Sequence, residues 1–216
     1  LAGGALTEEW SQAWEHHMLP ENSPAFIHKV MEYLDFYQLD GVDFDLEWGD
    51  VNEKYSPFVL QLRDSLTAHG LELTAALPAT HRYPDITDEA LAAFDWINMM
   101  AYDLTGPWNP SNAGPHSPYS FALGAMFYWE GQGVSKSNLT LGVPFYGYDF
   151  GSNPVTAYRY ATIVGWDPNN AQYDQVDEVY YNGIPTIIQK TDLALDHLSG
   201  IMIWELGQDD FSDLSL

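Results

Sequence analysis

LDGVDFDLEWGD, residues 39–50, places three acidic residues at alternate positions, Asp43, Asp45 and Glu47. Valine, phenylalanine and leucine occupy the intervening positions 42, 44 and 46. Successive side chains of a β-strand point to opposite faces of the sheet. The stretch therefore predicts a strand with three carboxylates on one face and an apolar surface on the other.

Carboxylates two residues apart on a strand are close enough to influence one another's ionisation. Their Cα atoms are separated by about 6.5–7 Å, and like charges at that range disfavour the ionised form. We expect at least one of the three groups to hold a proton at neutral pH, as a general acid must. A solvated edge strand is the alternative interpretation, and the remainder of the chain distinguishes the two.

Short apolar strands alternate with helical segments along the chain. The expected strands are residues 1–5, 41–48, 71–78, 96–103, 139–147 and 200–207. The expected helices are residues 22–39, 55–70, 86–94, 116–133 and 185–197. Ser23 and Ser56 each precede a proline, which predicts an N-cap followed by proline at the first helical position. Thr87 is expected to cap a third helix, and Gly70 to end the second.

Polar or aromatic residues stand at the carboxyl ends of four expected strands. They are Glu47, Tyr102 with Asp103, Tyr146 with Tyr148, and Trp204 with Glu205. In a (β/α)8 barrel these ends form the mouth of the active site. An open doubly wound sheet is the competing fold, but no glycine-rich phosphate loop opens a helix. The pattern therefore favours an α/β fold of the (β/α)8 TIM-barrel type.

The number of strands falls short of a complete barrel. Six strands are recognisable, whereas a (β/α)8 barrel has eight and typically spans about 250 residues. The terminal FSDLSL has the pattern of a first helical turn. Residues 149–181 are rich in Tyr, Asn, Pro and Asp and are long for a connection between a strand and a helix. We expect a small insertion there, within one domain spanning residues 1–216.

The charge of the chain limits its partners. The sequence has 7 Lys and Arg and 31 Asp and Glu, which gives a net charge of −24. Such a field repels nucleic acid and anionic membranes, both of which require basic contacts. The chain has no cysteine, no apolar run of about 18 residues that would span a bilayer, and no signal peptide at Leu1. We expect secretion, directed by a signal upstream of these residues.

No cofactor or metal is expected. The seven histidines have no metal-binding spacing. Residues 167–178 offer oxygen ligands but lack the glycine and terminal glutamate of a calcium loop. We interpret that segment as a solvated acidic loop.

The motifs, taken together, resemble those of glycoside hydrolase family 18, the chitinase family. DGVDFDLE, residues 40–47, is similar to the family's Asp-Gly-x-Asp-x-Asp-x-Glu catalytic strand. LAGGAL at residues 1–6 resembles strand 3, with the paired glycines Gly3 and Gly4 as candidate substrate-binding positions. NMMAYDLTGPW at 98–108, LGVPFYG at 141–147 and GIMIWELGQDD at 200–210 resemble strands 6, 7 and 8. By this resemblance, strands 1 and 2 and most of helix 8 are absent from the chain.

The resemblance implies a substrate-assisted glycosidase mechanism, an exception to the usual pair of carboxylates. In it, the 2-acetamido oxygen of the substrate attacks the anomeric carbon, and Glu47 acts first as acid and then as base. Asp45 is expected to accept a hydrogen bond from the acetamido N–H and to share a proton with either Asp43 or Glu47. Tyr102 is expected to donate to the acetamido group.

Further residues are implied to bind the sugar. Asp103 is expected to hold sugar hydroxyls, Trp204 to form the floor beneath the −1 sugar, and Trp108 to stack on a sugar face. Met100 and Tyr146 complete the expected substrate-binding set. The family often has an arginine after PFYG, whereas this chain has Tyr148.

The resemblance implies hydrolysis of chitin or of N-acetylglucosamine oligosaccharides as the function. An endo-β-N-acetylglucosaminidase acting on N-glycans is the first alternative, but Met100, Tyr102 and Asp103 favour a chitinase. A non-hydrolytic chitin-binding lectin is the second, and the presence of Glu47 disfavours it. Two unpaired barrel edges also favour pairing with another chain, so dimerisation through them is a further hypothesis.

Overall fold

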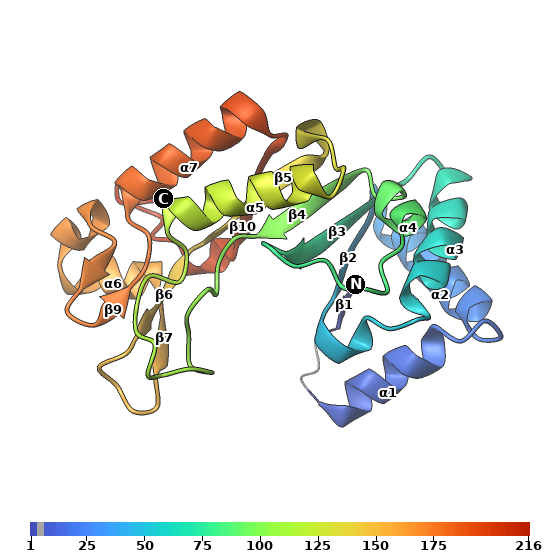
Figure 1. Cartoon of the computed structure of the whole chain (residues 1–216), viewed down its shortest axis with the longest axis horizontal. Coiled ribbons are helices and arrows are strands. Elements are labelled where there is room, and N and C mark those ends of the chain that lie inside the picture. The colour runs from blue at the N-terminus through green and yellow to red at the C-terminus, as the bar shows by residue number, and fades with distance from the viewer. Residues whose placement is uncertain (4–6) are drawn as a thin grey trace. The chain divides into compact units, whose positions relative to one another are not determined.

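The computed structural model describes residues 1–3 and 7–216. The described chain folds into two compact units, labelled by element in Figure 1. The first unit comprises residues 1–77 and 81–98, and the second comprises residues 78–80 and 99–216. The division between them falls inside β4 (Trp96–Met100). Each unit contains parallel strands with helices packed beside them.

The first unit holds the carboxylate strand. Its helices are α1 (Glu8–His17), α2 (Ser23–Tyr37), α3 (Tyr55–Thr67) and α4 (Asp88–Ala92). Its strands are β1 (Ala2–Gly3), β2 (Gly41–Leu46), β3 (Glu72–Pro78) and the beginning of β4. β2 runs parallel to both β1 and β3, with Ala2 opposite Asp45 and Gly41 opposite Glu72.

The apolar face of β2 forms the core of the first unit. Phe44 and Leu46 are completely buried and Val42 is 7% exposed. The Phe44 ring lies 5.3–5.7 Å from the rings of Trp14, Tyr55 and Phe58, in tilted and edge-on arrangements. Such aromatic pairs add stability beyond the area they bury. The predicted alternation of this strand is therefore confirmed.

Strand β2 approaches β3 very closely at its first residue. A Cβ atom at Gly41 would lie 2.2 Å from the carbonyl oxygen of Glu72. Only glycine fits at this close approach of two backbones. The glycine of the DGVD motif is therefore a packing requirement of the sheet.

The expected helices of the first unit form, but two of their predicted caps are wrong. Asn22 and Lys54 occupy the N-cap positions of α2 and α3, and neither side chain makes a capping hydrogen bond. Ser23 is buried and donates instead to Gln61 Oε1 at 2.6 Å. Ser56 likewise donates to the Asp85 carbonyl at 2.6 Å. In both cases the serine hydroxyl bonds to a residue distant in sequence and does not cap its own helix.

Other helix signals hold. Thr87 caps α4, its hydroxyl accepting from Ala90 N at 3.2 Å. Gly70 follows α3 with φ +69°, the left-handed conformation that commonly ends a helix.

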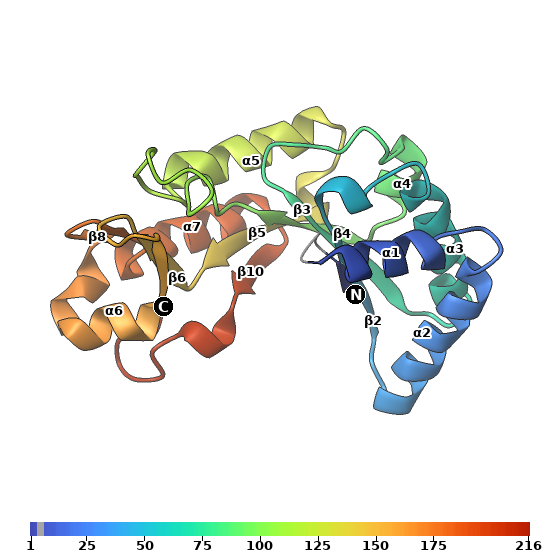
Figure 2. The same ribbon diagram turned by 90° about the horizontal axis from the view of Figure 1, so that it is seen from below.

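The second unit is built on β5 (Leu139–Pro144) and β10 (Gly200–Trp204), which pair in parallel over five residues. Helix α7 (Ile184–His197) packs on both strands, and α5 (Tyr119–Gly131) lies beside α7 (Figure 2). The end of β4 neighbours β5 in the strand order. Among the described residues, β1 is an edge strand of the first unit and β10 an edge strand of the second, so neither unit closes its strands into a barrel there.

Residues 146–181 carry a second, antiparallel sheet. Its strands, in the order β7-β6-β9-β8, are Thr156–Arg159, Tyr146–Asp149, Val179–Tyr180 and Gln175–Val176. Helix α6 (Tyr160–Trp166) follows β7. Its Tyr160 and Ile163 side chains are buried in a separate apolar cluster that also includes Tyr181. Residues 149–181 therefore include regular structure in addition to loops.

A strand lies within each range expected from the sequence, although residues 4 and 5 of the first range lie outside the described residues. The α/β class is confirmed. Short 3₁₀ turns complete the regular structure at Trp48–Asp50, Lys136–Asn138, Pro168–Gln172 and Leu206–Gln208. The prediction of a helical turn in FSDLSL is wrong, because residues 211–216 form a non-helical turn. There Ser215 Oγ donates to Asp209 Oδ2 at 2.6 Å, and such side-chain hydrogen bonds compete with helix formation.

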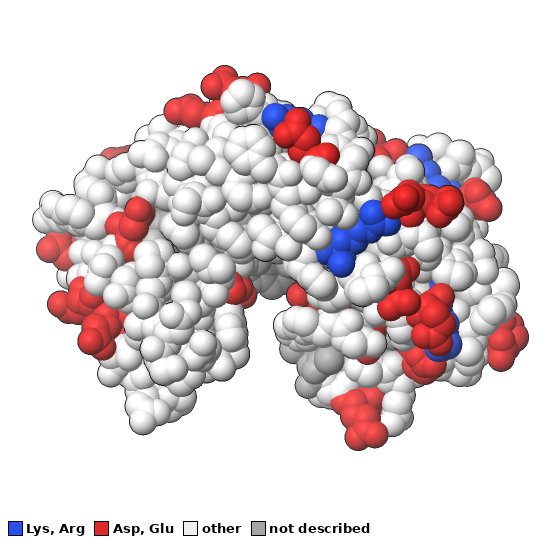
Figure 3. All heavy atoms as spheres, viewed as in Figure 1, with Lys and Arg blue, Asp and Glu red and all other residues white. Residues whose placement is uncertain are grey.

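Acidic side chains are spread over the face shown in Figure 3, with few Lys and Arg between them. Within the described part of the chain, no helix is long and apolar enough to cross a membrane.

We predict that Phe44→Ala will destabilise the chain by about 3–5 kcal/mol, because it leaves a cavity among three aromatic rings. Urea unfolding followed by tryptophan fluorescence would measure the loss. Phe36→Ala, at a side chain 77% exposed, is the matched control and should change stability by less than about 0.5 kcal/mol. Equal losses in the two variants would show that β2 does not organise the core.

Candidate active site

The three predicted carboxylates lie on one side of the polypeptide, as the alternation requires. Asp43 and Asp45 belong to β2, and Glu47 is the first residue after it. Glu47 keeps an extended backbone, with φ −127° and ψ 161°, so the alternation continues through it. Asp43 is exposed, while Asp45 and Glu47 are partly buried.

Asp43 is held by neutral donors from the two following strands. Thr74 Oγ1 donates to Asp43 Oδ1 at 2.5 Å, and Asn98 Nδ2 donates to the same oxygen at 2.7 Å. Thr74 on β3 and Asn98 on β4 are both buried. The two bonds fix the orientation of this carboxylate. Sequence analysis missed both partners, although each is a polar residue within an otherwise apolar strand.

Asp45 has a perturbed ionisation. Burial and the neighbouring charge of Asp43 raise its pKa to about 6, and the amino group of Leu1 opposes the change. Its Oδ1 atom is buried without a hydrogen-bond partner among the described residues. A buried acceptor without a donor is costly, so this oxygen is available to an N–H or O–H group of a ligand.

Tyr83 is a further member of the carboxylate site that sequence analysis missed. Its side chain is buried, and its hydroxyl accepts a hydrogen bond from Trp48 N at 2.9 Å. Burial raises the pKa of this phenol, and the charges of Glu47 and Asp45 raise it further. The bond anchors the backbone immediately after Glu47, where Trp48 adopts a left-handed φ of 53°.

The second unit gathers tyrosines around Asp103. Tyr146 and Tyr148 donate to Asp103 Oδ1 at 2.5 and 2.9 Å, respectively. Burial, followed by the charge of Asp103, raises the pKa of both phenols, so both remain protonated donors. Tyr148 therefore contacts Asp103 from the position where the resemblance led us to expect an arginine. Because Tyr148 is a neutral donor, it orients Asp103 without itself compensating the negative charge.

A pocket of about 370 Å³ opens beside Asp103 in the second unit. Its lining includes Tyr146, Tyr148 and Trp204, together with Arg159 and Gln208. The Trp204 side chain is 51% exposed. The pocket thus offers an anionic group next to flat aromatic surface, a combination suited to a polyhydroxylated ring.

The remaining predicted residues of the second unit lie near the same elements. The Tyr102 hydroxyl lies 3.9 Å from Met202 Sδ, and its ring is edge-on to that of Tyr146 at 6.3 Å. Trp108 is 59% exposed, with its ring 5.9 Å from that of Tyr148. Met100, at the end of β4, is partly buried.

The two predicted glycines have different outcomes. Gly3 lies in β1 and pairs with Leu46, next to the carboxylates. Gly4 lies outside the described residues.

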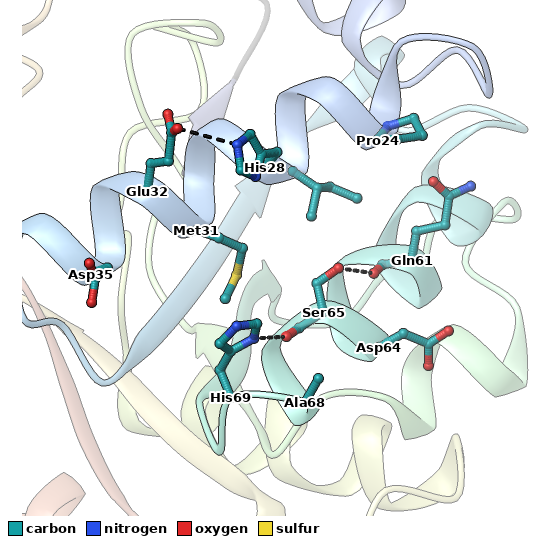
Figure 4. A pocket seen from close by; sticks show the side chains of 11 residues that line it. Pro24, His28, Met31, Glu32, Asp35, Gln61, Asp64, Ser65, Ala68 and His69 are labelled. Atoms are coloured by element: carbon teal, nitrogen blue, oxygen red, sulfur yellow. Dashed lines mark hydrogen bonds and ion pairs between the residues drawn. The ribbon is translucent and has the colours of Figure 1, made fainter.

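A different pocket lies between α2 and α3 in the first unit (Figure 4). All its lining residues fall within residues 24–35 and 61–69, so it is not formed by the predicted site residues. His28 and Glu32 lie on its rim, 3.2 Å apart. Across the described residues, no group of three or more His, Asp or Glu side chains is arranged to hold a metal ion.

In both units, then, the carboxyl ends of parallel strands carry acidic or aromatic side chains, the arrangement of the active-site rim of a (β/α) barrel. Residues 2–209 match the sequence profile described as Glycosyl hydrolases family 18. The chain therefore belongs to this family.

Individual relatives agree with this assignment. The chain is 46% identical to the chitinase ChiB from the chitin utilization locus of Flavobacterium johnsoniae, covering 100% of this chain and 70% of that one, with a TM-score of 0.97. It is 25% identical to Probable chitinase 10 of Drosophila melanogaster over 90% of this chain and 11% of that protein. The chain thus spans a small part of that relative.

A more distant relative shows the fold alone. A class V chitinase from Nicotiana tobaccum, solved in complex with NAG4, is 22% identical over 99% of this chain and 76% of that one, with a TM-score of 0.81.

We predict that Asp45→Asn will stabilise the chain in a pH-dependent manner. A folded-state pKa of about 6 exceeds the unfolded value of 3.8, so the native state binds more protons between these values. The stability of the unsubstituted chain should therefore fall as pH rises from about 4 to 6. The variant lacks this loss, so its advantage should develop between about pH 4 and pH 6 and then level off, at less than about 3 kcal/mol because partial exposure to solvent screens the charge.

Urea unfolding of both proteins from pH 4 to pH 7.5 would test this expectation. Parallel stability curves across that range would contradict a raised pKa at Asp45.

Proposed function

We propose that this chain hydrolyses β-1,4-N-acetylglucosaminide bonds in chitin or chito-oligosaccharides with retention of configuration. The observation that carries the proposal is the alternation of Asp43 and Asp45 on β2 with Glu47 on its extended continuation. Asp43 is hydrogen-bonded to Thr74 and Asn98, and the pKa of Asp45 is raised. Family membership and the chitinase names of the relatives support the same substrate class. Chitin is an insoluble polymer outside the cell, so we also propose that the protein is secreted.

The proposed reaction has two steps. First, the 2-acetamido oxygen of the −1 sugar attacks the anomeric carbon while Glu47 transfers its proton to the departing glycosidic oxygen. This gives a cyclic oxazolinium ion and a shortened chain. In the second step, the Glu47 carboxylate takes a proton from water as that water attacks the same carbon. The ring opens, and Glu47 regains its proton.

Asp45 is the residue that holds the acetamido group in this scheme. Its Oδ1 atom is buried without a protein partner in the described chain, and the acetamido N–H would supply the missing donor. A developing positive charge on the oxazolinium ring would be stabilised by an ionised Asp45. Asp43, already fixed by Thr74 and Asn98, would influence Asp45 by charge rather than by contact with the sugar.

Family resemblance assigns further sugar-binding roles to residues of the second unit. Tyr102 is proposed to donate to the acetamido oxygen, and Asp103 to accept from sugar hydroxyls. Trp204 would form the floor beneath the −1 sugar and Trp108 a stacking surface, both being more than half exposed. Tyr146 would contribute through its hydrogen bond to Asp103, and Met100 through apolar contact.

We predict that Glu47→Gln will abolish hydrolysis of a chromogenic chitobioside by the 216-residue chain. General acid–base groups typically contribute about 10²–10⁴-fold to rate, and glutamine cannot transfer the proton. Binding of chitotetraose, followed by tryptophan fluorescence, should change little because the two side chains have nearly the same shape.

Glu53→Gln is the matched control, since this acid is 76% exposed and lies in the loop after the site. It should retain full activity. Hydrolysis that persists in Glu47→Gln, or that is lost equally in Glu53→Gln, would contradict the role of Glu47. Cleavage of an N-glycan in preference to the chitobioside would instead favour an endo-β-N-acetylglucosaminidase.

A further inference from the structure

Tyr102 and Asp103 lie in a stretch that lacks regular structure. β4 ends at Met100, and residues 101–103 belong to no helix or strand. Asp103 adopts φ +61°, the left-handed region that non-glycine residues rarely occupy. Such a conformation persists only when the surrounding contacts determine it. The contacts that fix this stretch therefore matter for any role of these two side chains.

His116 and Ser117 supply those contacts, and both are completely buried. Ser117 Oγ donates to the Ala101 carbonyl at 2.5 Å. Leu104 N donates to the His116 carbonyl at 2.9 Å. The stretch that contains Tyr102 and Asp103 is thus tied to residues 116–117 on both sides.

The His116 ring adds a third connection. Asp103 N lies 3.4 Å from His116 Nδ1, and His116 Nε2 lies 3.2 Å from the Tyr146 carbonyl. When Nδ1 accepts from the Asp103 amide, Nε2 carries the hydrogen and donates to Tyr146. The ring also lies 5.0 Å from the rings of both Tyr146 and Tyr148. His116 therefore joins the backbone of Asp103 to the strand that carries its tyrosine partners.

Residues 116–117 are in turn held by Lys190 of α7. The Lys190 side chain is completely buried. Its Nζ atom donates to Ser117 O at 2.7 Å, to Ser117 Oγ at 2.6 Å and to Asn182 Oδ1 at 2.6 Å. These three acceptors match the three N–H bonds of an ammonium group.

Burying a lysine without an ionic partner costs free energy of desolvation. None of the ion pairs in the described part of the chain involves Lys190, and burial lowers its pKa. An apolar side chain of the same volume would fill the space without the cost of desolvating a charge. The lysine is instead part of a series of hydrogen bonds that leads from Lys190 Nζ through Ser117 Oγ to the carbonyl of Ala101, the residue before Tyr102.

We propose that Lys190, Ser117 and His116 are positioning residues that fix Tyr102 and Asp103 for the reaction. The inference rests on the proposed function for its catalytic consequence, and on the contacts of the second unit for its geometry. None of the three residues is proposed to touch the substrate. They act by holding the stretch that presents the acetamido donor and the hydroxyl acceptor.

Two readouts test the proposal, with Lys190→Met as the principal variant and Leu193→Ala as the matched control. Leu193 is 6% exposed and lies on the same helix, so its truncation also weakens the core. In Lys190→Met, hydrogen exchange of the amides of residues 103 and 104 should accelerate at least about tenfold. The value of kcat/KM for the chitobioside should fall about 10- to 100-fold. Leu193→Ala should leave both within about twofold at a temperature where it is folded.

Ser117→Ala is the second variant, used if Lys190→Met does not fold, and the same acceleration and loss are expected. Unchanged exchange at residues 103 and 104, or equal acceleration in the Leu193→Ala control, would overturn the proposal. A chain without any hydrolytic activity would overturn the proposed function, while hydrogen exchange would still decide whether Lys190 fixes this stretch.

Discussion

The alternation of side chains along β2 is the constraint on which the first unit and its candidate site both depend. Phe44 and Leu46 are completely buried, and their burial fixes the face of the strand that turns toward the helices. A shift of one residue would exchange the two faces and would bury Asp43 and Asp45 among aromatic rings. The hydrophobic core thus selects the register, and the register places the carboxylates.

Each unit orients one carboxylate with two hydrogen bonds from side chains of other elements. Asp43 receives hydrogen bonds from Thr74 and Asn98, and Asp103 receives them from Tyr146 and Tyr148. In each case the donors are neutral hydroxyl or amide groups, so these hydrogen bonds orient the carboxylate without transferring a charge to it. This use of neutral donors is consistent with a chain that has few Lys and Arg and a net charge of −24.

The sequence was most informative where a pattern extends over several residues. Apolar strands bounded by turns predicted all six strands of the larger sheet, and the spacing of Asp43, Asp45 and Glu47 predicted their shared face. It was least informative where a partner is distant in the chain. Ser23 and Ser56 carry the local signature of a cap, but each bonds a group at least 29 residues away. Thr74 and Asn98 stand out only as polar residues within apolar strands, and their partners, like those of Lys190, become apparent only when separate elements pack together.

Two glycines lie where neighbouring backbones leave no room for a side chain, and these positions tolerate no substitution. A Cβ at Gly41 would meet the Glu72 carbonyl at 2.2 Å, and one at Gly142 would meet the Met99 carbonyl at 2.4 Å. Any mutation at these sites forces neighbouring backbones apart, so neither can drift during evolution or be varied in a library. Trp108 and Trp204, more than half exposed, carry no such restriction. The exposed aromatic side chains can therefore be exchanged while the backbone beneath them remains unaltered.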